Sequence, residues 1–124
     1  MQIKECVLIE PYTCHEDELI VEVAKKLRKT TLRHVFVVNK ESHPQGIISV
    51  LDINNRIVAE GKDPKTMKAK DIMSKPIDVI NFTDDVELVA KSMIQKSRAM
   101  NAVVRDKKIV GIITITELLR MVKV

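Results

Sequence analysis

The sequence predicts an α/β fold of the α+β sandwich kind, and three observations support this class. Val and Ile total 31 residues whereas Leu supplies eight, and stiff β-branched side chains favour a sheet over a helical bundle. Short, continuous apolar runs are typical of strands that are covered on both faces. Between these runs, apolar residues recur at helical spacing. Helices that alternate with buried strands predict a layered fold of this class.

The apolar runs predict four strands, at residues 35–38, 46–51, 102–104 and 109–115. A loop at 39–45 joins the first two strands, and the loop at 105–108 joins the second two. Two amphipathic helices are predicted from spacings of i, i+3, i+4 and i+7. Short helices are expected at 52–60 and 116–122, each directly after the strand that contains Gly46 or Gly111. The two helical stripes consist of Ile20, Val23, Ala24 and Leu27, and of Val86, Val89, Ala90 and Met93.

The chain repeats itself. The two helical stripes align at an offset of 66 residues, and the same offset places Val37 and Val38 on Val103 and Val104. After a one-residue difference in the hairpin loop the offset becomes 65, and GIISVLDI at 46–53 aligns with GIITITEL at 111–118. A stripe, a strand and a polar pattern that recur in the same order indicate a tandem duplication.

The chain of 124 residues and 14.1 kDa is predicted to form one compact module made of two repeats, 1–62 and 63–124. Each repeat holds about 60 residues, which is marginal for an independent hydrophobic core. We therefore expect the repeats to pack through their sheets with pseudo-twofold symmetry, which would create related clefts between them. Gly61 and Pro64 mark the connection, because glycine readily ends a helix and proline cannot extend one.

Composition excludes several classes of protein. No apolar run approaches the roughly 20 residues that a membrane-spanning helix needs, and the N-terminus lacks a signal-peptide layout, so we expect a cytoplasmic protein without a membrane partner. Cys6 and Cys14 are too few for a disulfide scaffold and are expected to be free buried thiols. The net charge of +4 is weak evidence about partners.

These motifs resemble a tandem pair of CBS domains, the regulatory unit often called a Bateman module. The resemblance extends from about Cys6 to Val122 and rests on the strand-to-helix motifs GIISVLD at 46–52 and GIITITE at 111–117. The connection AEGKDP at 59–64, followed by KDIM at 70–73, is also similar to that of the family. The resemblance implies two β-α-β-β-α repeats with clefts that bind adenine nucleotides.

In the first motif, Ser49 and Asp52 are candidate ligand-binding residues. The Ser49 hydroxyl, at a strand end, can meet a phosphate oxygen near the N-terminus of the next helix, where free N–H groups favour anions. Asp52, three residues later, can accept both ribose hydroxyls through its two carboxylate oxygens. The alternative is a plain helix N-terminus, in which Asp52 serves the helix dipole.

In the second motif, Thr114 keeps the hydroxyl but Glu117 replaces the aspartate of the family pattern. The additional methylene would push the carboxylate deeper into the cleft or turn it aside. We therefore expect the Asp52 cleft to be the better nucleotide site and the Glu117 cleft to be weaker, altered or empty.

The resemblance implies further contacts. Backbone around Thr13 and Val79 would recognise the adenine edge, and Phe36 stands where the family usually has proline. His34 or Arg33 could reach a phosphate, and Arg98 is the nearest basic residue in the second repeat. For Arg33 and Arg98 the alternative is a solvated helix C-terminus, where cations are favoured.

We expect a non-enzymatic sensor that binds AMP, ADP, ATP or S-adenosylmethionine and signals to an effector protein in trans. The resemblance implies a homodimer formed through helices, with contributions from the stripe around Leu27 and Met93 or from the region of Met100. Ser49, His34 and Asp52 do not form a hydrolase motif, because the second glycine of Gly-x-Ser-x-Gly is missing. The cysteines and histidines match no paired zinc spacing, so neither a catalytic nor a metal site is expected.

The alternative function is a protein-interaction or assembly module with vestigial clefts, and in one version of it the basic linker binds nucleic acid. Three scattered aromatic residues cannot form the stacking platform that single-strand binders use, so a solvated linker is the favoured interpretation. The linker cations are Arg56, Lys62, Lys65, Lys68, Lys70 and Lys75, set against Glu60, Asp63 and Asp71.

Overall fold

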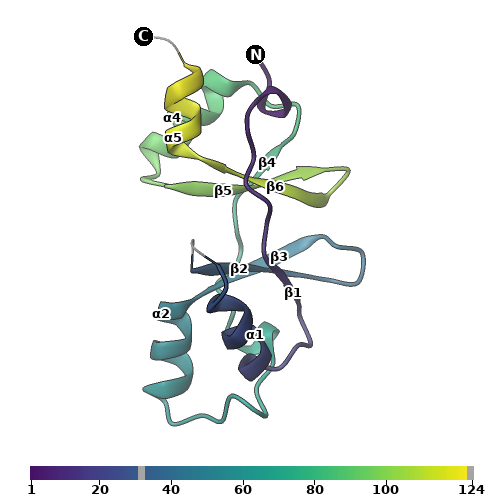
Figure 1. Cartoon of the computed structure of the whole chain (residues 1–124), viewed down its shortest axis with the longest axis vertical. Helices are drawn as coiled ribbons and strands as arrows, with labels where there is room; N and C mark the ends of the chain where they lie inside the picture. The colour runs from purple at the N-terminus through teal and green to yellow at the C-terminus, as the bar shows by residue number, and fades with distance from the viewer. Residues whose placement is uncertain (31–32, 123–124) are drawn as a thin grey trace. The chain divides into compact units, whose positions relative to one another are not determined.

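The computed structural model describes residues 1–30 and 33–122, and the chain divides into two compact units (Figure 1). The first-repeat unit consists of Tyr12–Ile77, and the second-repeat unit combines Met1–Pro11 with Asp78–Val124. Each unit contains one three-stranded sheet with helices, which confirms the predicted mixed α/β class. The boundaries of the compact units do not coincide with the sequence halves 1–62 and 63–124. Residues 63–77 join the first repeat, and residues 1–11 join the second repeat.

The sheet of the first-repeat unit has the strand order β1-β2-β3. Strand β1 (Thr13–His15) runs parallel to β2 (His34–Val38), and β2 pairs antiparallel with β3 (Pro44–Ser49). The predicted strands at 35–38 and 46–51 are thus present, although Val50 and Leu51 already belong to the next helix. The helices of this unit are α1 (Ile20–Leu27), α2 (Val50–Ile53), the π-helix η2 (Asn54–Val58) and α3 (Ala69–Ile72).

The second-repeat unit has the same topology, with the order β4-β5-β6. Strand β4 (Val79–Asn81) is parallel to β5 (Met100–Arg105), which is antiparallel to β6 (Lys108–Thr114). Both hairpins carry a register shift at the same place, between Val37 and Val38 and between Val103 and Val104. The helices are the 3₁₀ turn η1 (Ile3–Glu5), α4 (Val86–Gln95) and α5 (Ile115–Met121).

Each unit has its own hydrophobic core between its sheet and its helices. In β2, Val35 and Val37 are fully buried and pack in this core, whereas Phe36 and Val38 lie on the other face of the strand, as the period of two requires. The predicted helical stripes also face the cores, since Leu27 is 5% exposed and Met93 is 1% exposed. The apolar residues that recur in the sequence are therefore the residues that face the two cores.

The connecting segments pack in equivalent ways. In the first-repeat unit the linker segment, residues 67–74, bonds to the start of α1 through Ile20 N to Met67 O (2.9 Å) and to β3 through an antiparallel bridge between Ile47 and Ser74. In the second-repeat unit the N-terminal segment, residues 1–9, makes the matching bonds: Val86 N to Met1 O (2.9 Å), and a bridge between Ile9 and Ile112. The unit formed around each repeat is thus closed by a segment that lies outside that repeat.

Two glycines make this closure possible. A Cβ atom on Gly46 would lie 2.7 Å from the Met73 sulfur and 2.9 Å from the Ser74 carbonyl oxygen, and a Cβ on Gly111 would lie 2.8 Å from the Leu8 Cβ. Only a residue without a side chain allows the two segments to approach β3 and β6 this closely. The glycine that begins each strand-to-helix motif is therefore a packing residue.

None of the described helices combines the length and the apolar composition that a membrane span requires.

Candidate functional site

The first strand-to-helix motif folds into a capping box. Strand β3 ends at Ser49, which is the N-cap of α2, and the Ser49 Oγ accepts a hydrogen bond from Asp52 N at 3.1 Å. In return, Asp52 Oδ2 accepts from Ser49 N at 2.8 Å and from Ser49 Oγ at 3.1 Å. These reciprocal bonds satisfy backbone donors that the helix start leaves free. Asp52 therefore lies in the first turn of a capped helix, where the alternative interpretation placed it, and its carboxylate also caps the Ser49 N–H.

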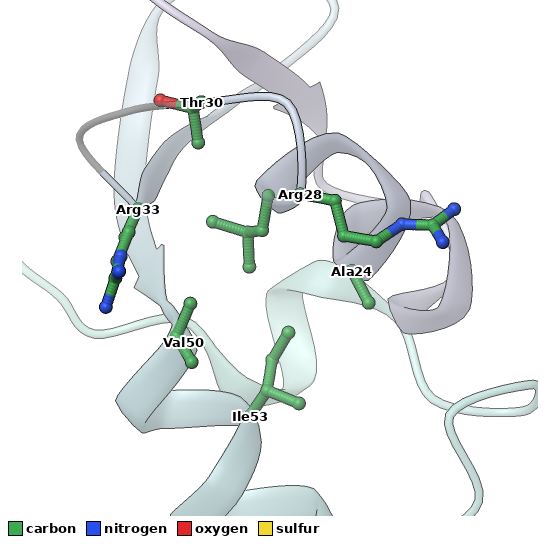
Figure 2. A pocket seen from close by; sticks show the side chains of 7 residues that line it. Ala24, Arg28, Thr30, Arg33, Val50 and Ile53 are labelled. Atoms are coloured by element: carbon green, nitrogen blue, oxygen red, sulfur yellow. The ribbon is translucent and has the colours of Figure 1, made fainter.

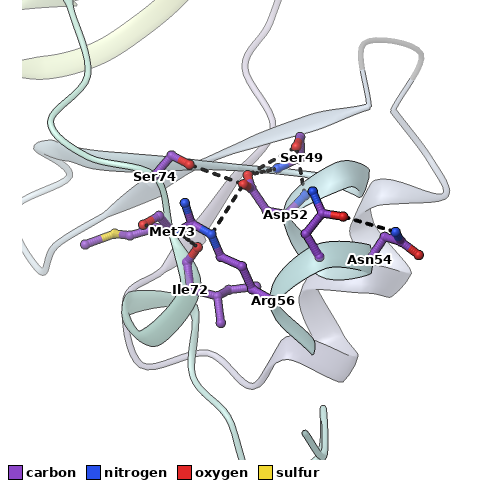
Figure 3. Close-up of polar contacts among 8 residues, drawn as sticks. Ser49, Asp52, Asn54, Arg56, Ile72, Met73 and Ser74 are labelled. Atoms are coloured by element: carbon purple, nitrogen blue, oxygen red, sulfur yellow. Dashed lines mark hydrogen bonds and ion pairs between the residues drawn. The ribbon is translucent and has the colours of Figure 1, made fainter. Parts of the chain in front are cut away.

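The second carboxylate oxygen of Asp52 faces the linker segment. Asp52 Oδ1 accepts a hydrogen bond from Ser74 Oγ at 3.2 Å and lies 3.9 Å from Arg56 Nε (Figure 3). Arg56 in turn donates through Nη1 to the carbonyl oxygens of Ile72 at 2.7 Å and Met73 at 3.3 Å. The Asp52 side chain keeps 16% of its surface exposed. Asp52 thus joins the motif helix to the linker segment through a serine hydroxyl and an arginine.

The second motif holds its carboxylate through different partners. Thr114 is the N-cap of α5, and its Oγ1 accepts from Glu117 N at 3.2 Å. The Glu117 carboxylate accepts from Arg120 Nε and Nη2, both at 2.8 Å, and from the backbone N–H of Val7 at 2.8 Å. The pKa of Glu117 lies below its ordinary value, mainly because the Arg120 guanidinium donates to the carboxylate and also because the Val7 N–H does. Glu117 thus ties α5 to the N-terminal segment.

The two carboxylates differ in what an incoming hydroxyl would have to replace. At Asp52 Oδ1 a ribose hydroxyl would replace the hydroxyl of Ser74, a donor of the same kind that can turn to water. At Glu117 it would displace a bidentate arginine or the backbone N–H of Val7, which together donate three hydrogen bonds to this carboxylate. The geometry therefore favours Asp52 as the carboxylate that can exchange partners.

The sheet of the first-repeat unit brings further candidate residues beside this motif. Thr13 pairs with Phe36 across β1 and β2, and His34 pairs with Ser49 across β2 and β3. Phe36 is 3% exposed, and its backbone N–H donates to Tyr12 O at 2.9 Å. Thr13, His34, Phe36, Ser49 and Asp52 therefore lie in one unit, along adjacent strands and at the start of α2.

The candidates of the second-repeat unit are less closely grouped. Val79 pairs with Ala102 at the start of β4 and is 44% exposed. Arg98 precedes β5, and its Nη2 lies 3.5 Å from Asp78 Oδ2. Arg98 is therefore ion-paired on the protein surface. Thr114, in contrast, pairs with Met100 across β5 and β6.

Sequence reasoning missed the partners of the two carboxylates. Arg56 and Arg120 follow Asp52 and Glu117 by four and three residues, a helical spacing that brings side chains together and could have identified both pairs. The contacts of Ser74 and of the Val7 N–H had no such signal, because they depend on how the two connecting segments pack.

The basic linker is partly neutralised within its own unit. Lys70 Nζ lies 3.0 Å and Lys68 Nζ 3.8 Å from Asp17 Oδ1, and Arg56 is bound as described above. This pairing reduces the free positive charge that a nucleic-acid surface would require.

The two thiols are free. Burial raises the pKa of the Cys14 thiol to about 12, so this side chain stays protonated and unreactive at neutral pH. Cys6 is half-buried. The pKa of its thiol is raised mainly by desolvation and also by the negative charge of Glu117. Within the described part of the chain, no group of three or more His, Cys, Asp or Glu side chains could hold a metal ion.

Two equivalent αβ units, each with a capped strand-to-helix motif, define a tandem-repeat module. The family model for the CBS domain matches residues 3–59 and again 69–124, and the chain belongs to this family as a tandem CBS pair. CBS pairs are generally regulatory rather than catalytic modules. The resemblance inferred from the motifs is thereby confirmed.

Similarity to individual proteins agrees with this assignment. An uncharacterized protein of Methanopyrus kandleri, MK0525, is 33% identical over 105 residues, which cover 84% of this chain and 54% of that protein. The chain thus spans about half the length of this curated relative.

Two solved structures extend the comparison. The CBS domain pair of the protein MJ0100, in complex with 5′-methylthioadenosine and S-adenosyl-L-methionine, is 27% identical with a TM-score of 0.75, and the match covers 98% of this chain and 94% of that one. The hexameric CBS-CP12 protein from bloom-forming cyanobacteria is 29% identical with a TM-score of 0.71, over 96% and 69% of the two chains.

Proposed function

We propose that this CBS pair binds an adenine-containing ligand at the Asp52 motif and passes the signal to a partner protein in trans. The observation that carries the proposal is the state of the Asp52 carboxylate. One of its oxygens fixes the helix start through Ser49, and the other accepts from a serine hydroxyl and retains some exposure. A ribose hydroxyl can take the place of that serine hydroxyl without leaving a backbone group unpaired.

The ligand class is supported by the likeness to the MJ0100 pair, whose structure contains 5′-methylthioadenosine and S-adenosyl-L-methionine. The candidates are AMP, ADP, ATP and S-adenosylmethionine, which share the adenosine group. A phosphate would meet the N-terminus of α2 and the basic side chain of Arg33 or His34 at the start of β2, whereas a sulfonium ligand would use the ribose contact alone. Thr13 and its neighbours along β1 would contribute backbone groups for the adenine edge.

Ligand exchange at Asp52 would also change the linker segment. The Ser74 hydroxyl and the Arg56 guanidinium both contact Asp52, and Arg56 holds the carbonyl groups of Ile72 and Met73. A ligand that takes Oδ1 therefore loosens residues 72–74, and a partner protein can sense this change. We also propose that copies associate through their helices. Leu27 and Met93 are buried, so the association would use exposed apolar side chains on α2, α4 and α5, among them Val50, Leu51, Leu88, Ile94 and Leu119.

A thermal-shift assay with AMP, ADP, ATP, S-adenosylmethionine and 5′-methylthioadenosine tests the proposal. At a hundredfold excess of ligand over its dissociation constant, binding stabilises the fold by about 2.7 kcal/mol. We expect a shift with at least one ligand, its loss in Asp52→Ala and its retention in Glu117→Ala. Asp52→Asn, which keeps an acceptor for Ser49 N, distinguishes loss of the ligand contact from loss of the helix cap. Absence of a shift with every ligand, or an undiminished shift in both Asp52 variants, would contradict the proposal.

A further inference from the structure

Each long helix packs against the other helices of its unit on one side and lies beside the edge strand of its sheet on the other. In the first-repeat unit, the helix side carries a pocket of about 670 Å³, and Figure 2 shows Ala24 on α1 with Val50 and Ile53 on α2 around it. That pocket belongs to the helical surface through which copies are proposed to associate. The strand side differs between the two repeats, because only one of them has a lysine there.

In the first-repeat unit this lysine, Lys26, joins α1 to β1. Its Nζ donates to Glu18 Oε1 at 2.9 Å and to the carbonyl oxygen of Thr13 at 3.1 Å. Lys26 is half-buried, and such a lysine buries its aliphatic stem against apolar surface while its charged head stays with polar partners. A carboxylate and a main-chain carbonyl thus hold an ammonium group at this place.

The second-repeat unit keeps the acceptors but lacks the lysine. At the offset of 66, Lys26 corresponds to Ser92 and Glu18 corresponds to Asp84. Strand β4 pairs with β5 in the register in which β1 pairs with β2, so a main-chain carbonyl recurs at the edge of the sheet. Where the lysine is missing, a pocket of about 200 Å³ opens. Its lining residues are Ile80, Asp84, Asp85, Leu88, Val89 and Ser92.

The negative charge of this pocket is not balanced within it, because none of the lining residues is basic. Asp84 is half-buried, and its Oδ2 accepts from Asn81 N at 2.8 Å. Among the residues that the structure describes, no donor bonds to its Oδ1. Asp85 caps α4 through Leu88 N at 3.1 Å and lies 3.9 Å from the amine of Met1. Asp84 therefore offers the oxygen that can accept from a ligand.

We propose that this pocket binds the primary ammonium group of a small, unbranched aliphatic amine, in the place that the Lys26 ammonium occupies in the first repeat. The three N–H donors of such a group match Asp84 Oδ1, the Ser92 hydroxyl and the edge carbonyl of β4, and the carbon chain would cover Ile80 and Val89. A neutral alcohol lacks the charge that Asp84 attracts, and a quaternary ammonium ion has no N–H to donate. No residue proposed for the adenine ligand lines this pocket.

Titration of the ¹⁵N-labelled protein with butylamine, butanol and tetramethylammonium, followed by NMR at neutral pH, tests the proposal. Butylamine is protonated under these conditions, as a lysine side chain is. We expect it to shift the amide signals of Leu88, Val89 and Ser92. It should bind about fivefold more tightly than butanol or tetramethylammonium, which is the scale of one partly exposed ion pair.

Three variants separate the pocket from the rest of the surface. Asp84→Asn keeps an oxygen for the backbone N–H that Asp84 caps, and it should weaken butylamine by a similar factor of about five. Ser92→Lys supplies the lysine of the first repeat from within the chain and should abolish the butylamine shifts. Glu87→Gln removes an exposed carboxylate from the same helix outside the pocket, and it should leave butylamine binding unchanged.

The proposal is overturned if butanol binds as tightly as butylamine, or if butylamine binding is unchanged in both Asp84→Asn and Ser92→Lys. A lysine of a second copy is the competing source of the ammonium group, because Leu88 is also among the side chains proposed for association. Analytical ultracentrifugation with and without butylamine decides this point. If the wild type is a dimer that butylamine dissociates, the pocket is a protein interface and the proposal fails. An unchanged state of association, together with the butylamine shifts, supports it.

Discussion

After β3, the Oδ1 oxygen of Asp52 accepts from the hydroxyl of Ser74. After β6, the Glu117 carboxylate accepts from the backbone N–H of Val7 and from Nε and Nη2 of Arg120. The two positions are equivalent in the repeat, and both carboxylates bind a connecting segment. A side-chain hydroxyl can turn to water, but a backbone N–H is fixed by the path of the chain. The two repeats thus keep a carboxylate at the same position and hold it with donors of different kinds.

The largest expected effect is a loss of stability in the two hydrophobic cores, which should respond alike. Ile48 and Ile113 occupy matching positions, and both are fully buried. Ile→Ala at either position should lower the free energy of unfolding by about 2–5 kcal/mol, measured by denaturant titration. Val58→Ala, at a side chain that is 67% exposed, is the control and should change stability by less than about 0.5 kcal/mol. A loss at only one of the two isoleucines would mean that the repeats do not share one packing plan.

A smaller effect should distinguish the two carboxylates by pH. The folded pKa of Glu117 lies below its ordinary value of 4.5, so its stabilising effect is complete above that value and is lost as the pH falls through the lower folded pKa. Glu117→Gln should therefore be less stable than the wild type at about pH 6, and the difference should vanish at strongly acidic pH. The Val7 hydrogen bond suggests a loss of about 0.5–1.5 kcal/mol at neutral pH.

Unfolding followed by circular dichroism at several pH values measures this difference. Glu10→Gln removes an exposed carboxylate from the same unit and is the matched control. A constant difference between the wild type and Glu117→Gln from neutral to strongly acidic pH would show that the contact with Val7 and Arg120 does not depend on the charge of Glu117.

The smallest effect concerns the exchange at Asp52. Ser74→Ala removes the hydroxyl that competes for Oδ1, so adenine ligands should bind about two- to tenfold more tightly, in line with one net hydrogen bond. Isothermal titration with the ligand that gives the largest thermal shift measures this gain. Thr83→Ala, at an exposed hydroxyl of the second-repeat unit, is the control. Weaker binding in Ser74→Ala would instead make Ser74 a ligand contact rather than a competitor.

The sequence predicted the parts of the fold that depend on periodic patterns. These parts are the stripes on α1 and α4 and the apolar runs of β2, β3, β5 and β6. Each pattern occurs in both repeats, so each copy supports the prediction made for the other. The division of the predicted helix 52–60 into α2 and the π-helix η2 was not predicted, because no pattern of apolar residues distinguishes these turns.

The candidate site was predicted in part. Ser49 with Asp52 and Thr114 with Glu117 form the motif pairs that the spacing indicated, because a cap and the third helical residue always approach each other. The partners Ser74 and Val7 could not be inferred. Val7 contacts Glu117 through its backbone N–H, which every residue except proline offers whatever its side chain. Ser74 reaches Asp52 through its hydroxyl, but only because the linker segment packs beside β3.

The packing of residues 1–9 on the second-repeat unit has a consequence for synthesis on the ribosome. The first-repeat unit can close as soon as residue 77 has emerged, because Tyr12–Ile77 contains all of its strands and its linker segment. The second-repeat unit needs residues 1–9 and α5 together. Domains generally fold as units while the chain is made. Residues 1–9 are therefore made before the first-repeat unit, but their partners in α4 and β6 follow only after it.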